Sequence, residues 1–278
     1  MLVALLANPE SGRGEAREAE RLLQEHGAEL RRFTLARAGE AAESGASRIV
    51  VAGGDGSIGC AAQAAARAEV PLAVVPVGTA NDFARALGIP LDARAACRLA
   101  VAGTETQLLE LAWIGSRPFV NVASAGLSPV AARKARGLKR ILGPPAYTVG
   151  AIRAGLGARP ITCRVSCEGN PFFDGSAWQV SVAVTGAFGG GAKIGGDPHD
   201  GKLDVVVFEA GSRARLIAHA YRLRAGGVAS RSGVRSRRCR DAEVHTDGGT
   251  GLNVDGELVE AQNARFRVEA GAFEVVTG

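Results

Sequence analysis

VAGGDGSIGC, residues 51–60, joins an apolar run to a cluster of glycines that holds one aspartate and one serine. The apolar residues 48–54 predict a buried strand, and residues 57–67 predict a helix. Three of the glycines also satisfy the G-x-G-x-x-G spacing of a dinucleotide-binding turn. The stretch therefore leaves three alternatives open: a site for NAD, a site for ATP, or a tight turn without a ligand.

Apolar runs alternate with helical patterns over the first hundred residues. The predicted strands are 2–8, 29–35, 48–54 and 72–78, and the predicted helices are 14–27, 57–67, 79–88 and 93–103. Strands that alternate with helices indicate βαβ units, and such units build a mostly parallel sheet. The apolar start of the chain fits a first buried strand better than a signal peptide, because it has no basic residues and soon meets Asn-Pro.

The pattern changes after Gly103, where short β-like runs lie between glycine-rich turns. Helical segments are expected only near 129–140, 145–157 and 212–226. We therefore predict a first domain at 1–117 and a second, largely antiparallel β domain at 118–267, with a tail at 268–278 that packs back on the first domain.

The glycine turn does not fit either of two common nucleotide motifs. A dinucleotide turn follows the first strand of its sheet and needs an acidic residue about 20 positions later. Here the turn follows the third predicted strand, and the next strand ends VPVGT without an acid at its tip. A Walker phosphate loop fails as well, because no Gly-Lys-Ser/Thr follows.

Three polar loops follow parallel strands and so fall on one edge of the predicted sheet. They are 8–12, 53–57 and 78–82. Open α/β sheets bind ligands at this edge, and glycines and helix N-termini there present backbone N–H groups to anions. The alternative is three tight turns with Ser57, Thr79 and Asn81 as ordinary helix caps. The succession of three loops favours a ligand site.

The charge of the chain is unevenly distributed. Its formal net charge is +5, yet nine arginines and no acid lie between residues 210 and 240, and the other 24 basic side chains are outnumbered by 28 acidic ones. Together with a smaller cluster at 133–140, this run is either a solvated face or a surface for an anionic membrane or nucleic acid. The scarcity of aromatic residues disfavours nucleic acid.

Cysteine usage and hydropathy indicate the cellular compartment in which the protein works. The five cysteines are scattered without metal-ligand spacing, which favours a reducing, cytoplasmic setting. No apolar run approaches the ~20 residues that span a bilayer. Homodimerisation is left open.

The motifs together resemble a known family. They are Asn8-Pro9-Glu10-Ser11-Gly12, Gly53-Gly54-Asp55-Gly56-Ser57, Gly78-Thr79-Ala80-Asn81-Asp82, Leu87-Gly88-Ile89-Pro90, Asn121 to Gly126, Asp200-Gly201-Lys202-Leu203-Asp204 and Asn253-Val254-Asp255-Gly256-Glu257. Their order resembles the diacylglycerol kinase catalytic-domain family, in its YegS-like and diacylglycerol kinase B-like bacterial branch. The resemblance implies an α/β N-terminal domain like that of NAD kinases and 6-phosphofructokinases, followed by an antiparallel β-sandwich.

The resemblance also implies site residues, with ATP and Mg²⁺ as cofactors. The ATP-binding positions would be Asn8, Thr34, Gly53, Gly54, Asp55, Gly56, Ser57, Ile58, Gly59, Thr79, Asn81 and Asp82. Asp55 would act as a ligand of the Mg²⁺ on the phosphates, since its own charge repels them. Glu257 would be the general base, and the alternative for Glu257 is a hairpin residue beside an Asp-Gly turn.

A second, structural Mg²⁺ would be held by Asp197, Asp200 and the backbone carbonyl of Lys202. The chain departs from the family pattern at several positions. Gly59-Cys60 stands where Asn-Glu is expected, Leu127-Ser128 lacks an expected acid, and Gly195-Gly196 replaces an expected proline in a shortened loop. These departures leave the substrate, the second metal site and the level of activity open.

The leading hypothesis is an ATP- and Mg²⁺-dependent lipid kinase of phospholipid biosynthesis that phosphorylates diacylglycerol or a related glycerolipid. It would be cytoplasmic and peripherally membrane-associated through the arginine-rich stretch 213–240. The alternatives are a kinase of NAD or a sphingoid base, and a nucleotide- or lipid-binding regulator without turnover.

Overall fold

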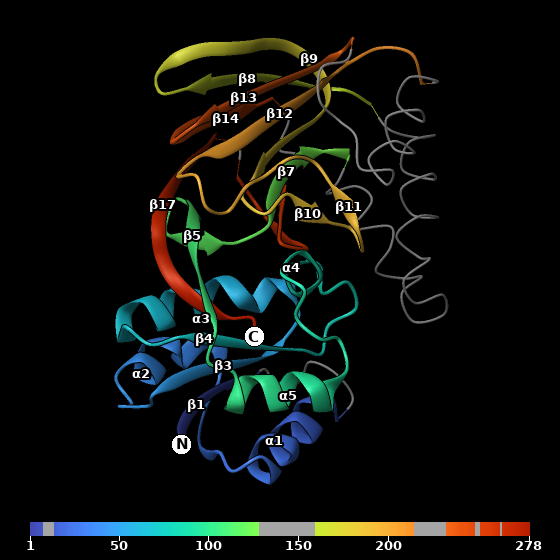
Figure 1. Cartoon of the computed structure of the whole chain (residues 1–278). Coiled ribbons are helices and arrows are strands. Elements are labelled where there is room, and N and C mark those ends of the chain that lie inside the picture. The colour runs from blue at the N-terminus through green and yellow to red at the C-terminus, as the bar shows by residue number, and fades with distance from the viewer. Residues whose placement is uncertain (8–13, 128–158, 214–231, 248–250, 262) are drawn as a thin grey trace. The chain divides into compact units, whose positions relative to one another are not determined.

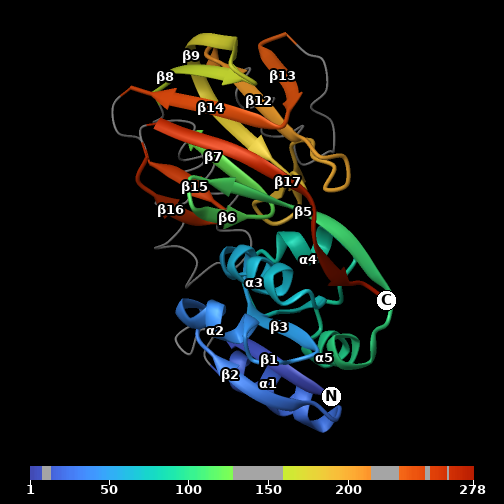
Figure 2. The same cartoon turned by 90° about the vertical axis from the view of Figure 1, so that its left-hand side faces the viewer.

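The computed structural model describes residues 1–7, 14–127, 159–213, 232–247, 251–261 and 263–278. The chain forms two compact units (Figures 1 and 2). Unit 1 comprises Met1–Leu111 and Glu269–Gly278, and unit 2 comprises Ala112–Val268. No helix within the described ranges is both long and apolar enough to cross a bilayer. The helical segments expected near 129–140 and 145–157, and nearly all of the one at 212–226, lie outside the described residues.

Unit 1 is built on a parallel sheet. Its strands are β1 (Leu2–Ala7), β2 (Glu29–Phe33), β3 (Arg48–Gly53) and β4 (Leu72–Pro76), in the order β2-β1-β3-β4. β1, β3 and β4 are apolar and nearly fully buried because helices cover both faces of the sheet, as in other parallel sheets. The predicted parallel sheet is confirmed.

Helices pack on both faces of this sheet (Figure 1). They are α1 (Glu15–Glu25), α2 (Ala38–Ala42) after a short 3₁₀ turn at Leu35–Arg37, α3 (Asp55–Ala68), α4 (Asp82–Ala86) and α5 (Ala93–Ala102). α1 and α5 pack together on one face, where Leu22, Leu23 and Cys97 join Val50 and Val75 in one core. α3 lies against β3 and contacts α2 on the other face. The i, i+3, i+4 spacing of the buried residues in α1 is that of an amphipathic helix.

The last residues of the chain belong to unit 1. β17 (Asn263–Val276) places Val275 in parallel register with Leu72 of β4. The carbonyl of Gly278 accepts hydrogen bonds from the N–H groups of Thr104 and Glu105, at 3.0 and 3.1 Å. Val276 is buried in the same core as α1 and α5. The C-terminal residues are therefore part of the first unit's sheet and core.

Unit 2 consists of antiparallel strands. Its strands are β5 (Thr106–Ile114), β6 (Arg117–Phe119), β7 (Val122–Gly126), β8 (Ile161–Cys167), β9 (Asn170–Ala183), β10 (Ala187–Phe188), β11 (Ala192–Lys193), β12 (Leu203–Glu209), β13 (Val234–Cys239), β14 (Asp241–Thr246), β15 (Leu252–Val254), β16 (Glu257–Val259) and the first part of β17; β5 begins in unit 1. The long strand β9 pairs with β8 along its first half and with β7 and β12 along its second. One strand thus takes part in both layers of a sandwich.

Alternating apolar residues form the core of unit 2. β8 reads ITCRVSC, in which every second side chain is buried. These side chains meet the inner faces of β9, β12 and β14, and Phe119 packs edge-on to Phe266 with ring centroids 6.1 Å apart. The predicted antiparallel β domain is confirmed. Strand β13 was not predicted, because VRSRRC carries no apolar alternation and pairs only with β12.

Candidate functional site

The predicted nucleotide loops of unit 1 lie on one edge of the parallel sheet. Thr34 follows β2, Gly54 follows β3, and residues 77–81 follow β4. Parallel strands end on the same side, and the register pairs Gly53 directly with Pro76. Asn8 lies outside the described residues.

Two of these loops touch through their backbones. A Cβ atom added to Gly78 would lie 2.5 Å from the Cα atom of Gly54, and one added to Gly54 would lie 3.2 Å from the Cα atom of Gly78. Only glycine permits this approach. The VAGGDGSIGC turn and the Gly-Thr loop are therefore one structural feature, although they are 24 residues apart in sequence.

Asp55 connects the same turn to the next helix. Its Oδ1 accepts a hydrogen bond of 2.8 Å from the N–H of Phe83, in the first turn of α4. Asp55 also opens helix α3, where a carboxylate is stabilised by the helix dipole. Ser57 shapes the turn from inside, because its Oγ donates a 2.6 Å bond to the carbonyl of Gly54.

Asn81 fixes the Gly-Thr loop. Its backbone is in the left-handed region at φ 50°, its Oδ1 accepts from the N–H of Gly78 and its Nδ2 donates to the carbonyl of Gly78, both at 2.9 Å. Neither Asn81 nor Ser57 makes a side-chain cap to its helix, so the expected capping by these two residues is wrong. The alternative of tight turns without a ligand stays open.

The remaining predicted positions of unit 1 differ in exposure. Thr79 and Thr34 are exposed, Gly56 is half-buried, and Asp82 is only 5% exposed. Ile58 is 2% exposed, so its side chain belongs to the core. The strand-end edge therefore offers two hydroxyl groups and the N-terminus of α3, an arrangement that suits phosphate groups.

In unit 2, Asp255 and Glu257 belong to a tight hairpin. β15 and β16 pair through Val254 and Glu257, and Asp255 and Gly256 form the turn with φ angles of 47° and 89°. Positive φ at both turn residues is the type I′ geometry that Asp-Gly favours. The hairpin alternative for Glu257 is thus correct as local structure, and it leaves the side chain exposed at the hairpin.

The carboxylate of Asp255 is committed to the backbone of a neighbouring loop. It accepts hydrogen bonds from the N–H groups of Val120, Asn121 and Val122, at 2.9, 3.0 and 3.0 Å. The buried side chain of Asn121 in turn accepts a 2.6 Å bond from the hydroxyl of Thr185. Asp255 therefore holds the segment between β6 and β7 against the hairpin.

Glu257 forms an ion pair with Arg117 at the start of β6. The side chains are 54% and 37% exposed, so solvent screens the pair and its contribution to stability is small. The ion pair matters more for geometry than for stability, because the guanidinium of Arg117 orients the Glu257 carboxylate, which the sequence predicts to be the base.

The predicted structural metal loop is held by internal contacts. Asp197 Oδ1 accepts from the N–H of His199 at 3.2 Å, and Asp200 Oδ1 accepts from the N–H of Lys202 at 2.9 Å. Arg238 forms an ion pair with Asp200, and its Nε lies 3.8 Å from Asp204 Oδ2. Burial raises the pKa of the Asp204 carboxyl, and the hydrogen bond from the N–H of Gly196 opposes that rise.

These contacts do not match a divalent-cation site. No three His, Cys, Asp or Glu side chains within the described ranges gather as metal ligands. Of the two carboxylates in this set, that of Asp200 already pairs with Arg238, and that of Asp197 accepts a backbone N–H. The residues present therefore do not fit the structural Mg²⁺ that the resemblance implies.

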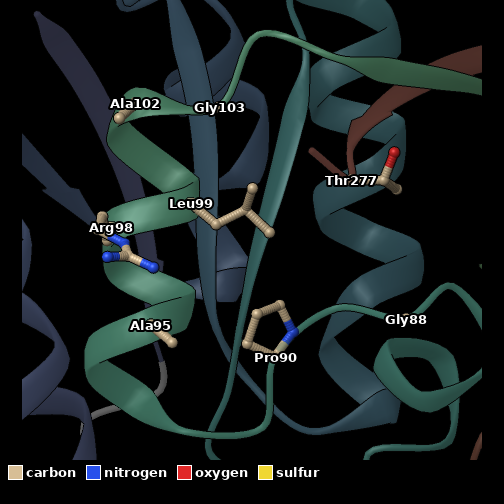
Figure 3. A pocket seen from close by; sticks show the side chains of 8 residues that line it. All are labelled: Gly88, Pro90, Ala95, Arg98, Leu99, Ala102, Gly103 and Thr277. Atoms are coloured by element: carbon tan, nitrogen blue, oxygen red, sulfur yellow. The ribbon is translucent and has the colours of Figure 1, made fainter.

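Unit 1 also has a surface hollow of about 350 Å³ (Figure 3). It is lined by Gly88, Pro90, Ala95, Arg98, Leu99, Ala102, Gly103 and Thr277. None of the predicted site residues lines it, so it is not the predicted nucleotide site.

Comparison with known proteins identifies the family. The diacylglycerol kinase catalytic domain matches residues 2–111, and the YegS C-terminal NAD kinase beta sandwich-like domain matches residues 121–277. A probable lipid kinase YegS-like of Pseudomonas fluorescens is 31% identical, over 94% of this chain and 82% of that protein. The chain belongs to the diacylglycerol kinase family, in its YegS-like branch of lipid kinases.

Other relatives and solved structures agree with this family. A probable lipid kinase YegS-like of Stenotrophomonas maltophilia is 34% identical, over 83% of this chain and 78% of that protein. The structure of a putative diacylglycerol kinase from Bacillus anthracis has a TM-score of 0.78 at 22% identity and covers 99% of this chain and 97% of that one. An NAD kinase from Archaeoglobus fulgidus in complex with ATP has a TM-score of 0.55 at 14% identity, covering 99% and 93% of the two chains. The last two likenesses show the fold, and the predicted fold class is confirmed.

Sequence reasoning missed Arg117 and Arg238. Each forms an ion pair with an acidic residue that is distant in sequence: Arg117 with Glu257, and Arg238 with Asp200. For Arg117 no local signal exists. For Arg238 the signal would have been the pairing of β12 with β13, which the arginine-rich sequence of β13 hides.

Proposed function

We propose that this member of the diacylglycerol kinase family transfers the γ-phosphoryl group of ATP to the hydroxyl of diacylglycerol or a related glycerolipid. The product would be a lipid of the phosphatidic-acid type. The observation that supports nucleotide binding is the backbone contact between Gly54 and Gly78, which joins two phosphate-type loops at the start of α3. Family membership supports the lipid as acceptor.

The proposed site assigns a role to each unit. In unit 1, the residues proposed to bind and orient the ATP phosphates are 53–59, Thr79 and Asn81, together with the predicted positions Asn8, Thr34 and Asp82. Mg²⁺, when bound with ATP, neutralises charge on the phosphates, and Asp55 is the side chain that would hold it. The hydrogen bond from Phe83 occupies one lone pair of Asp55 Oδ1 and sets the direction of the other oxygen.

In unit 2, Glu257 accepts the proton of the lipid hydroxyl. The O–H bond breaks as the hydroxyl oxygen bonds to the γ-phosphorus, and the bond from that phosphorus to the oxygen of the leaving ADP breaks. Arg117 orients the Glu257 carboxylate before the substrate enters. We propose the domain limits 1–117 and 118–267, with the tail 268–278, as the units that carry these two roles.

The experiment is phosphoryl transfer from labelled ATP, in the presence of Mg²⁺, to a panel of lipids that includes diacylglycerol, a monoacylglycerol and a sphingoid base. A labelled diacylglycerol product supports the proposal, and transfer to no lipid overturns it. Glu257→Gln should lose turnover while keeping ATP affinity. Glu260→Gln is the matched control, because Glu260 is an exposed glutamate three residues further along the same segment.

Two other functions remain as outcomes of the same experiment. Phosphorylation of NAD or of a sphingoid base in place of a glycerolipid would show that the substrate belongs to a different chemical class. ATP binding by calorimetry without transfer to any acceptor would point to a non-catalytic regulator, for which Gly59-Cys60 is the motivation because it lacks the polar groups of Asn-Glu.

We further propose a cytoplasmic, peripherally membrane-associated enzyme. The support is the arginine-rich stretch 213–240, of which the structure describes residue 213 and residues 232–240. Each basic residue near an anionic surface contributes about 1 kcal/mol. Sedimentation with vesicles that contain phosphatidylglycerol, compared with neutral vesicles, tests this proposal, and light scattering of the same protein tests for a homodimer.

A further inference from the structure

Two acidic side chains of unit 2 face one arginine. β12 and β13 pair so that Asp204 stands directly opposite Arg238. Arg238 forms an ion pair with Asp200, its Nε lies 3.8 Å from Asp204 Oδ2, and Asp197 is close enough to Asp204 to repel its charge. The side chains of Asp200 and Asp204 are only 22% and 16% exposed. Partly buried carboxylates in such a group need a neighbouring cation.

The neighbouring arginines of β13 have other partners. Arg235 pairs with Glu209 and lies 5.6 Å from the ring centroid of Phe173, and Arg237 lies over the ring of Phe172 at 4.9 Å. Successive residues of a strand point to opposite faces, so Arg238 points away from Arg235 and Arg237. Of the described arginines of β13, Arg238 is therefore the one that faces the acidic group.

The loop that these acids anchor is tightly packed against the rest of unit 2. The N–H of Gly196 donates to Asp204, and a Cβ atom at Gly196 would lie 2.3 Å from the carbonyl oxygen of Val184. Gly196 also has a φ of 91°, a backbone conformation that glycine adopts readily and other residues rarely adopt. The adjacent Thr185 hydroxyl bonds to Asn121, whose backbone N–H is held by Asp255. Movement of the acidic loop would therefore disturb the segment that positions the hairpin of Glu257.

We propose that the guanidinium of Arg238 takes the place of a structural divalent cation in the loop 196–204, so that this part of unit 2 keeps its structure without bound metal. The arginine supplies a permanent positive charge and several directed N–H donors to the two carboxylates that it contacts.

The experiment is thermal unfolding of the full chain without nucleotide, in EDTA and in millimolar Mg²⁺ or Ca²⁺, for wild type, Arg238→Met, Arg238→Lys and Arg237→Met. Wild type should unfold at the same temperature in EDTA and in either cation. Arg238→Met should lower the Tm by roughly 5–10 °C, because it leaves two partly buried carboxylates without their cation. Arg237→Met, the adjacent exposed arginine, should shift the Tm by about 2 °C or less.

Two results would overturn the inference. One is a wild-type Tm that falls in EDTA and recovers in Mg²⁺ or Ca²⁺, which would mean that the loop binds a metal. The other is an Arg238→Met variant no less stable than Arg237→Met. If Arg238→Met does not fold, Arg238→Lys, which keeps the charge but not the planar donors, should unfold below both wild type and Arg237→Met, and a Tm equal to that of Arg237→Met would overturn the inference. These measurements do not depend on turnover, so they stand or fall separately from the proposed kinase activity.

Discussion

Replacing Asp255 by asparagine should destabilise unit 2 far more than removal of an exposed charge. In the structure the two carboxylate oxygens accept three backbone N–H groups, at 2.9, 3.0 and 3.0 Å. An asparagine has the same shape but only one acceptor oxygen. If that oxygen serves Asn121 and Val122, the NH₂ group must face the N–H of Val120, and two donors oppose each other.

The magnitude follows from these three bonds. One buried donor left without an acceptor costs about 1–3 kcal/mol, and two bonds that lose their charged acceptor weaken by about 0.5–1 kcal/mol each. The sum is about 2–5 kcal/mol. For a unit of roughly 150–250 residues, 1 kcal/mol lowers the Tm by about 2–4 °C, so the expected decrease is about 4–20 °C.

The assay is thermal unfolding by circular dichroism with Asp174→Asn as the matched control, since Asp174 is an exposed aspartate of β9 in the same unit. Hydrogen exchange adds a local measurement, in which the amides of Val120, Asn121 and Val122 should lose protection in Asp255→Asn alone. If Asp255→Asn unfolds within about 1 °C of the control and keeps these three amides protected, the hydrogen bonds to Asp255 do not stabilise the unit and the reasoning is wrong.

Three further predictions concern other parts of the chain. Gly78→Ala should destabilise unit 1 by about 1–3 kcal/mol and weaken ATP binding, because the added Cβ atom would lie 2.5 Å from the Cα atom of Gly54. Gly39→Ala is the control, because its Cβ atom would meet only the end of the Arg67 side chain, at 3.6 Å. The control should leave the urea midpoint unchanged or raise it. Arg117→Met should lower kcat about tenfold with a Tm change of about 2 °C or less, since the ion pair with Glu257 is exposed; equal turnover of the variant and wild type would exclude a positioning role. Burial raises the pKa of the thiols of Cys97 and Cys163 from 9.0 to about 11. Between these two pH values the folded chain keeps protons that the unfolded chain releases. The free energy of unfolding should therefore fall as the pH rises from about 9 to 11, by about 2–3 kcal/mol per thiol. Urea midpoints at pH 8 and above pH 10 measure this loss, and Cys97→Ala should show a smaller loss than wild type; an equal loss would contradict it.

Local sequence predicted the first unit well because its signals are local. The buried strands of unit 1 are continuous apolar runs, and the loops between them carry the glycines and polar residues that mark strand ends. The Asp-Gly pair at 255–256 likewise indicates a type I′ turn by itself. The assignment of these loops to ATP, and of Glu257 to the base, stays a prediction.

The contacts that give the candidate site its geometry depend on pairing between distant segments. Nothing near Gly54 in sequence shows that Gly78 touches it, and nothing near Asp255 shows that it holds residues 120–122. The arginine-rich strand β13 illustrates the limit most clearly. Its charges suggested one continuous basic surface, yet pairing with β12 turns Arg238 toward Asp200 and Asp204 and away from its neighbours in sequence.

The place of the C-terminal residues has a consequence for how the protein is made. Val275 pairs with β4, Val276 completes the core shared by α1 and α5, and Gly278 accepts bonds from the residues that follow α5. These residues follow unit 2 in the sequence, so a ribosome synthesises them after the whole of unit 2. The nascent first unit therefore has an unpaired edge at β4 and an incomplete core while unit 2 is being synthesised, and in this interval it most needs protection from aggregation.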